Sequence, residues 1–165
     1  MIEILDWIGR FTTVLLLIAI VAGVYTWAKG ILPAMLRLGK GLAKRKIGIF
    51  AKGDNFNSLK DLLLDSKLFN SKNITHISSK SDFGKAEDQT LFLVFWPDFE
   101  DSLDEIMKLK KDGTALVVYA PQESGVIPRD KINILNAKRN VILTNFRGRL
   151  LNDIVVSLIT TSYEG

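Results

Sequence analysis

The sequence predicts an α/β protein: a three-layer sandwich around a five-stranded, mainly parallel sheet, preceded by one transmembrane helix. Three observations predict it. The segment from Phe11 to Ala28 is apolar and uncharged, and basic residues gather directly after it. From Lys46 onward, apolar runs of strand length alternate with stretches of helical period, which is typical of parallel strands joined by helices.

We divide the chain into three parts. Residues 1–28 are the N-terminal segment and transmembrane helix, residues 29–45 a basic juxtamembrane linker, and residues 46–165 an α/β domain. The aliphatic residues of the first part surround the whole helix, unlike the single stripe of a buried core helix. Glu3 and Asp6 stand where a cleaved signal peptide would be basic, so we expect an uncleaved anchor.

The linker has a marked excess of positive charge. One basic residue precedes the span, whereas six follow it: Lys29, Arg37, Lys40, Lys44, Arg45 and Lys46. This asymmetry predicts a single-pass protein of the cell inner (plasma) membrane, with its N-terminus outside and its α/β domain in the cytoplasm. The six cations are expected to contact membrane lipids. The linker either lies on the membrane surface or forms a helical extension or flexible stalk, and the sequence leaves both open.

Composition excludes several kinds of site. The 165 residues contain no cysteine and one histidine, His76, which excludes a disulfide framework, a thiolate zinc site, a cysteine nucleophile and a histidine-rich metal site. The net charge of +4 comes mainly from the linker, so nucleic acid is not expected as a partner. We expect no metal and find no cofactor motif, whereas a nucleotide stays open as a ligand.

Five apolar runs predict the strands of the sheet. They are KIGIFA (Lys46–Ala51), NITHIS (Asn73–Ser78), TLFLVFW (Thr90–Trp96), TALVVYA (Thr114–Ala120) and NVILTNF (Asn140–Phe146). The third run is the most apolar and is expected at the centre. The simplest arrangement of such strands is the order 2-1-3-4-5.

Helices are expected between the strands. Apolar residues at helical spacing predict them over about 55–69, 101–111 and 129–137, and from Arg147 to near the C-terminal end. The polar stretch 79–89 has room for a loop or one short helix. His76 lies in a predicted edge strand, where a lone histidine is expected to be a surface or structural residue.

Ligands of such sheets bind beyond the carboxyl ends of the strands. Three loops and the end of the fifth strand therefore supply the candidate ligand-binding residues: Lys52, Gly53, Asp54, Asn55, Trp96, Asp98, Gln122, Asn145 and Arg147. Gly53 and the helix after it offer an anion site, to which Lys52 adds charge, although the same residues also suit an ordinary helix cap. Arg147 begins a helix, where a cation opposes the dipole, so we expect either a bound anion or a salt bridge there.

The size, the five-strand order and the long polar stretch between the second and third strands resemble Toll/interleukin-receptor-like (TIR-like) and flavodoxin-like domains. Enzymatic TIR-like members use a glutamate on the helix after the third strand to cleave NAD. The resemblance thus implies Glu100 or Glu105 as catalytic candidates, but neither has the expected serine- and tryptophan-containing context. Solvated charges in the first turn of a helix are the alternative for both.

We therefore expect a non-catalytic, membrane-anchored sensor or assembly module that forms a homo-oligomer or binds a protein partner through its helix and its α/β domain. A single helix forms no pore or transport path alone, so function through association follows. The resemblance implies a role in bacterial signalling or antiviral defence. The alternatives are a membrane-tethered TIR-like nucleotide or NAD hydrolase and a structural subunit of a larger membrane complex.

Overall fold

The computed structural model describes the backbone of residues 2–124 and 126–161, and their side chains apart from those of residues 2–6, 34–38 and 40. The chain forms two compact units, Met1–Lys40 and Gly41–Gly165. The second unit begins upstream of residue 46, the predicted start of the α/β domain. Leu42 accounts for the difference, because its side chain is only 6% exposed and belongs to the core of the second unit.

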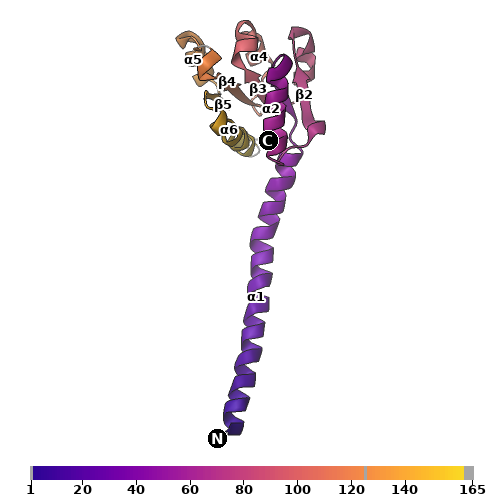
Figure 1. Ribbon diagram of the computed structural model, residues 1–165, viewed down its shortest axis with the longest axis vertical. Helices are drawn as coiled ribbons and strands as arrows, with labels where there is room; N and C mark the ends of the chain where they lie inside the picture. Colours follow the sequence, from indigo (N-terminus) through magenta and orange to yellow (C-terminus); the bar gives the residue numbers. More distant parts are fainter. Residues whose placement is uncertain (1, 125, 162–165) are drawn as a thin grey trace. The chain divides into compact units, whose positions relative to one another are not determined.

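A long helix, α1 (Ile2–Ala43), begins the chain (Figure 1). Its segment Trp7–Pro33 is long and apolar enough to cross a membrane, with a mean hydropathy of 2.0 and no part of it buried inside the protein. At about 1.5 Å per residue, its 27 residues extend about 40 Å, close to the thickness of a bilayer with its headgroups. The predicted linker is helical as far as Ala43, despite Pro33 within it.

The second unit contains the predicted parallel sheet. Its strands are β1 (Ile47–Phe50), β2 (Ile74–Ile77), β3 (Leu91–Phe95), β4 (Ala115–Tyr119) and β5 (Val141–Thr144). Their order is β2-β1-β3-β4-β5 and every neighbouring pair is parallel, as predicted. All residues of β1, β3 and β4 are buried, which explains why these strands read as continuous apolar runs.

The connecting helices cover both faces of the sheet, which confirms the three-layer sandwich. One apolar core packs α2 (Gly53–Asp65) and α6 (Arg147–Thr161) against the sheet. The other packs the short 3-10 helix η2 (Lys80–Ala86), α3 (Trp96–Phe99), α4 (Leu103–Leu109) and α5 (Arg129–Asn136) against the opposite face. Short 3-10 helices also form at Ser71–Asn73 (η1), Glu100–Ser102 (η3) and Gln122–Ser124 (η4).

The connection after β3 differs from the prediction. Trp96 was expected to end the third strand, with a helix starting at residue 101, but Trp96 instead begins α3. The reason is Pro97, which has no N–H to extend a strand ladder and whose fixed φ suits the first turn of a helix. Helical structure therefore starts directly at the end of β3 and continues through η3 and α4 to Leu109.

Candidate functional site

Two separate pockets at the carboxyl ends of the five strands are lined by described residues. The first, here called the charged pocket, has a volume of about 420 Å³ and lies beyond β1, β2 and β3, lined by Lys52, Ser79, Lys80, Pro97, Asp98, Phe99, Glu100, Asp101 and Ser102. The second, here called the apolar pocket, has a volume of about 400 Å³ and lies beyond β4 and β5, lined by Ala120, Gln122, Val126, Ile127, Ile132, Leu143, Thr144 and Asn145.

Asp98 joins two of the predicted ligand-binding loops. Its Oδ2 accepts a hydrogen bond from the backbone N–H of Lys52 at 2.6 Å and another from Nδ2 of Asn55 at 3.2 Å. Lys52 is the N-cap residue of α2 and makes no cap bond with its own side chain. A carboxylate of the protein therefore lies at the N-terminal end of α2, where the sequence left open either an anion site or an ordinary helix cap.

The remaining residues of this loop shape the turn into α2. Gly53 has a φ of 48°, in the left-handed region that favours glycine, and a Cβ atom there would meet no other atom within 4 Å. Asp54 is exposed in the first turn of α2 and lines neither pocket. The ammonium group of Lys52 lies over the Phe99 ring, 5.7 Å from its centroid.

The two catalytic candidates lie in different environments. Glu105 on α4 forms an ion pair with Lys80 of η2. Glu100 is exposed in η3 and lines the charged pocket, and it has no hydrogen bond or ion pair within the described residues. Glu105 is absent from the lining of that pocket, so the structure does not bring the two glutamates into one site.

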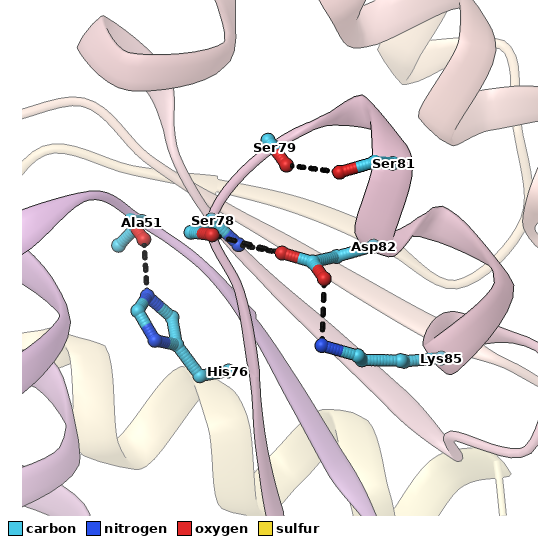
Figure 2. Close-up of polar contacts among 7 residues, drawn as sticks. All are labelled: Ala51, His76, Ser78, Ser79, Ser81, Asp82 and Lys85. Atoms are coloured by element: carbon cyan, nitrogen blue, oxygen red, sulfur yellow. Dashed lines mark hydrogen bonds and ion pairs between the residues drawn. The ribbon is translucent and has the colours of Figure 1, made fainter.

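A second polar cluster lies beside β2 (Figure 2). The Asp82 carboxylate accepts hydrogen bonds from the Ser78 backbone N–H at 3.1 Å, from the Ser78 hydroxyl at 2.8 Å and from Nζ of Lys85 at 2.6 Å. The bond from Lys85 is the largest cause, followed by those from Ser78, of a pKa of Asp82 far below its usual range. These bonds fix the start of η2 and leave the carboxylate charged.

His76 has a structural role, one of the two roles expected for it. Its Nε2 lies 2.9 Å from the carbonyl oxygen of Ala51, also shown in Figure 2, so this nitrogen carries the proton and donates. The imidazole ring stacks on Phe56, with 3.8 Å between the ring centroids. His76 thus links β2 to the end of β1 and to α2.

Two further candidate residues lie away from both pockets. Trp96, the first residue of α3, is 2% exposed and belongs to the apolar core, so it is not available to a ligand. Arg147 donates from Nη2 to the carbonyl oxygen of Ser58 at 3.0 Å and thereby ties the start of α6 to α2. A backbone carbonyl takes the place of the bound anion or acidic side chain expected for Arg147.

Gln122 and Asn145 are the predicted residues that meet in the apolar pocket. Both are exposed, and Thr144 beside them is 7% exposed. Within the described part of the chain, the side chains of these three residues form no hydrogen bond. The apolar lining was missed by the sequence analysis, although a Val-Ile pair directly after the polar loop PQESG was a readable signal for it.

No match came from comparison with protein-family models, curated proteins or solved structures. The chemistry therefore has to be inferred from the geometry alone. Within the described residues, no group of three or more His, Cys, Asp or Glu side chains is placed to hold a metal ion. The two pockets are the structural features from which a ligand can be argued.

The predicted membrane-surface residues are described in part. Lys44 and Lys46 are exposed and Arg45 is half-buried. The ammonium group of Lys29 lies 4.7 Å from the centroid of the Tyr25 ring, one turn earlier on α1. The side chains of Arg37 and Lys40 lie outside the described residues.

Proposed function

We propose that the protein is a membrane-anchored sensor or assembly module. In this proposal α1 holds the chain in the inner membrane, and the α/β unit in the cytoplasm binds a ligand or partner and associates with further copies. The observation that carries the proposal is that no part of the apolar segment Trp7–Pro33 is buried inside the protein. In water such a surface would be strongly unfavourable, whereas lipid tails cover it without a protein partner.

Hydroxyl groups within this segment have internal partners, as a lipid environment requires. Thr12, Thr13 and Thr26 each donate to a carbonyl oxygen one turn earlier on α1, at 2.8 to 2.9 Å. In hydrocarbon every polar group needs such an internal partner, because no water is present to replace it. The Lys29 ammonium beside the Tyr25 ring, at the end of the span, is an arrangement suited to the membrane interface.

The hydrogen bonds and ion pair formed by three acidic side chains favour binding over catalysis. Asp98, Asp82 and Glu105 are each engaged by groups of the protein itself, which gives all three a role in the fold. The resemblance to TIR-like domains is the ground for proposing a role in bacterial signalling or antiviral defence. The alternative of a TIR-like NAD hydrolase depends on Glu100, the exposed carboxylate of the charged pocket.

Association can be tested by the mass of the particle in detergent. Gly23→Leu adds a large side chain at a position where a Cβ atom has nothing within 4 Å, on the side of α1 that also presents Ala19 and Ala22. We expect this variant to reduce the particle mass, because small residues allow close helix contacts. Val14→Leu, in the same span, is the matched control and should leave the mass unchanged. A monomeric wild-type particle would contradict association.

Topology and catalysis have separate tests. In a chain without native thiols, Asn136→Cys introduces one exposed thiol on α5, which should resist an impermeant reagent in intact cells. Ready labelling would overturn the cytoplasmic orientation.

Incubation of the purified protein with NAD should leave the NAD intact. If NAD is consumed, and the double variant Glu100→Gln with Glu105→Gln stops its loss while staying folded, the hydrolase replaces our proposal.

A further inference from the structure

We infer that the apolar pocket beyond β4 and β5 binds a nucleoside and that its residues contact the nucleobase. The inference rests on the proposed function, since it names the chemistry of the ligand that the α/β unit would bind. It is carried by the joint presence of an apolar cavity, uncharged walls and two side-chain amides that have no partner in the described part of the protein.

The cavity has the size and walls of a small-molecule site. Its volume of about 400 Å³ lies within the usual range for such sites, toward the small end. Its walls come from three parts of the chain: Leu143 at the end of β5, Ile132 on α5, and Ile127 from the loop between β4 and α5. Such walls favour a flat apolar ring, which buries two broad faces against aliphatic side chains.

The polar groups of the pocket are amides and a hydroxyl. Gln122 and Asn145 each carry one acceptor oxygen and one NH₂ donor, and neither side chain has a hydrogen bond within the described residues. Nucleobases present adjacent donors and acceptors along one edge, so two side-chain amides can pair with such an edge. Thr144, also without a side-chain hydrogen bond in the described chain, borders the same space.

The absence of charge among the described lining residues decides between a base and an anion. A phosphate in this pocket would lose water without meeting a cation, which is unfavourable. The anion site predicted at the start of α2 lies at the charged pocket, where Asp98 already takes the bond from Lys52. The base would therefore supply the binding energy, and a phosphate attached to it would remain in solvent.

The exposed side chain of Val126 adds apolar surface that a bound ligand could cover. Its side chain is 89% exposed at the pocket margin, the highest value among the large hydrophobic residues whose side chains the structure describes. A ring seated between Ile132 and Leu143 would remove part of the Val126 surface from water and add to the favourable apolar contact.

The test is titration calorimetry on the full-length protein in detergent with adenosine, guanosine, cytidine and uridine, each compared with its 5′-monophosphate. At least one nucleoside should bind with one site per chain, and its monophosphate should bind within about threefold of it. The double variant Gln122→Ala with Asn145→Ala should weaken binding at least tenfold. Asn133→Ala, an exposed amide on α5 outside the pocket lining, is the matched control and should bind as the wild type does.

Three results would overturn the assignment: no binding of any of the four nucleosides, unchanged binding by the double variant, or binding of the monophosphate alone. Circular dichroism of each variant confirms that the α/β unit is folded. If no nucleoside binds while the wild-type protein remains in the membrane fraction and keeps its particle mass, the nucleobase assignment fails and the anchored assembly module stands. Loss of membrane association in the wild type would instead contradict the proposed function itself.

Discussion

The two halves of the carboxyl edge of the sheet differ in how their polar side chains are used. Beyond β1, β2 and β3, Asp98, Asp82 and Lys80 each have a partner within the protein, and exposed Glu100, which has none in the described structure, is an exception. Beyond β4 and β5, the Gln122 and Asn145 amides have none in the described structure and border an apolar cavity. Polar residues at strand ends therefore do not identify a ligand site by themselves. The informative residues are those that the fold leaves without a partner.

The strongest test of this comparison removes the hydrogen bonds between the segments that follow β1 and β3. Asp98→Ala leaves the Lys52 N–H and the Asn55 amide without their acceptor, and we expect it to lower the free energy of unfolding by about 1–3 kcal/mol. Urea unfolding followed by circular dichroism measures this loss. Asp61→Ala, an exposed carboxylate on α2, should change stability by less than about 0.5 kcal/mol. Equal effects would remove the special role of Asp98.

Acid should weaken the same half of the edge. The pKa of Asp82 is lowered from its ordinary value of 3.8, mainly by the bond from Lys85, so protonation is harder in the folded state than in the unfolded state. Its contribution to stability is then fully present above about pH 4 and is lost as the pH falls further. Asp82→Asn should flatten this part of the stability profile. Parallel profiles for the two proteins would show that Asp82 is not the group responsible.

A smaller effect is expected for the ion pair between Lys80 and Glu105. The two side chains are 56% and 46% exposed, and pairs of this kind contribute about 0–1 kcal/mol. A double-mutant cycle with Lys80→Ala and Glu105→Gln isolates the coupling energy, which added salt should reduce. A coupling well above this range would place Glu105 among the structural residues of the edge, and its replacement would no longer be a clean test of catalysis.

The smallest effect on stability is expected in the other half of the edge. Asn145→Ala removes an exposed amide without a hydrogen bond in the described structure, so the free energy of unfolding should change by less than about 0.5 kcal/mol. Chemical denaturation of the variant beside Asp98→Ala gives the comparison directly. A loss as large as that of Asp98→Ala would mean that Asn145 serves the fold and not a ligand.

Much of this fold is readable from local pattern. The buried strands β1, β3 and β4 produce uninterrupted apolar runs, and each predicted strand contains the observed one with one or two extra residues at each end. The order of the strands followed from the handedness and shortness of connections, which do not depend on detailed side-chain contacts. The apolar, uncharged run from Phe11 to Ala28 indicated the helix able to cross a membrane.

The site was less predictable because its contacts join distant parts of the sequence. The anion site or helix cap at the start of α2 was a local inference, whereas the carboxylate found there, that of Asp98, comes from α3. Arg147 likewise bonds a carbonyl on α2 that no local pattern could indicate. Leu42 belongs by sequence to the predicted basic linker. Its burial in the core that contains α2, α6 and one face of the sheet assigns it to the α/β unit.

The parallel sheet also bears on how the chain folds. No strand pairs through a hairpin: Ile47 of β1 pairs with Leu91 of β3, and Leu91 pairs with Ala115 of β4. Each pairing must close a long loop before any strand contact compensates for the lost entropy, which slows folding relative to helical bundles. During synthesis β1 emerges well before β3, so the backbone N–H and C=O groups on one edge of β1 stay unpaired until the ribosome has completed the centre of the sheet.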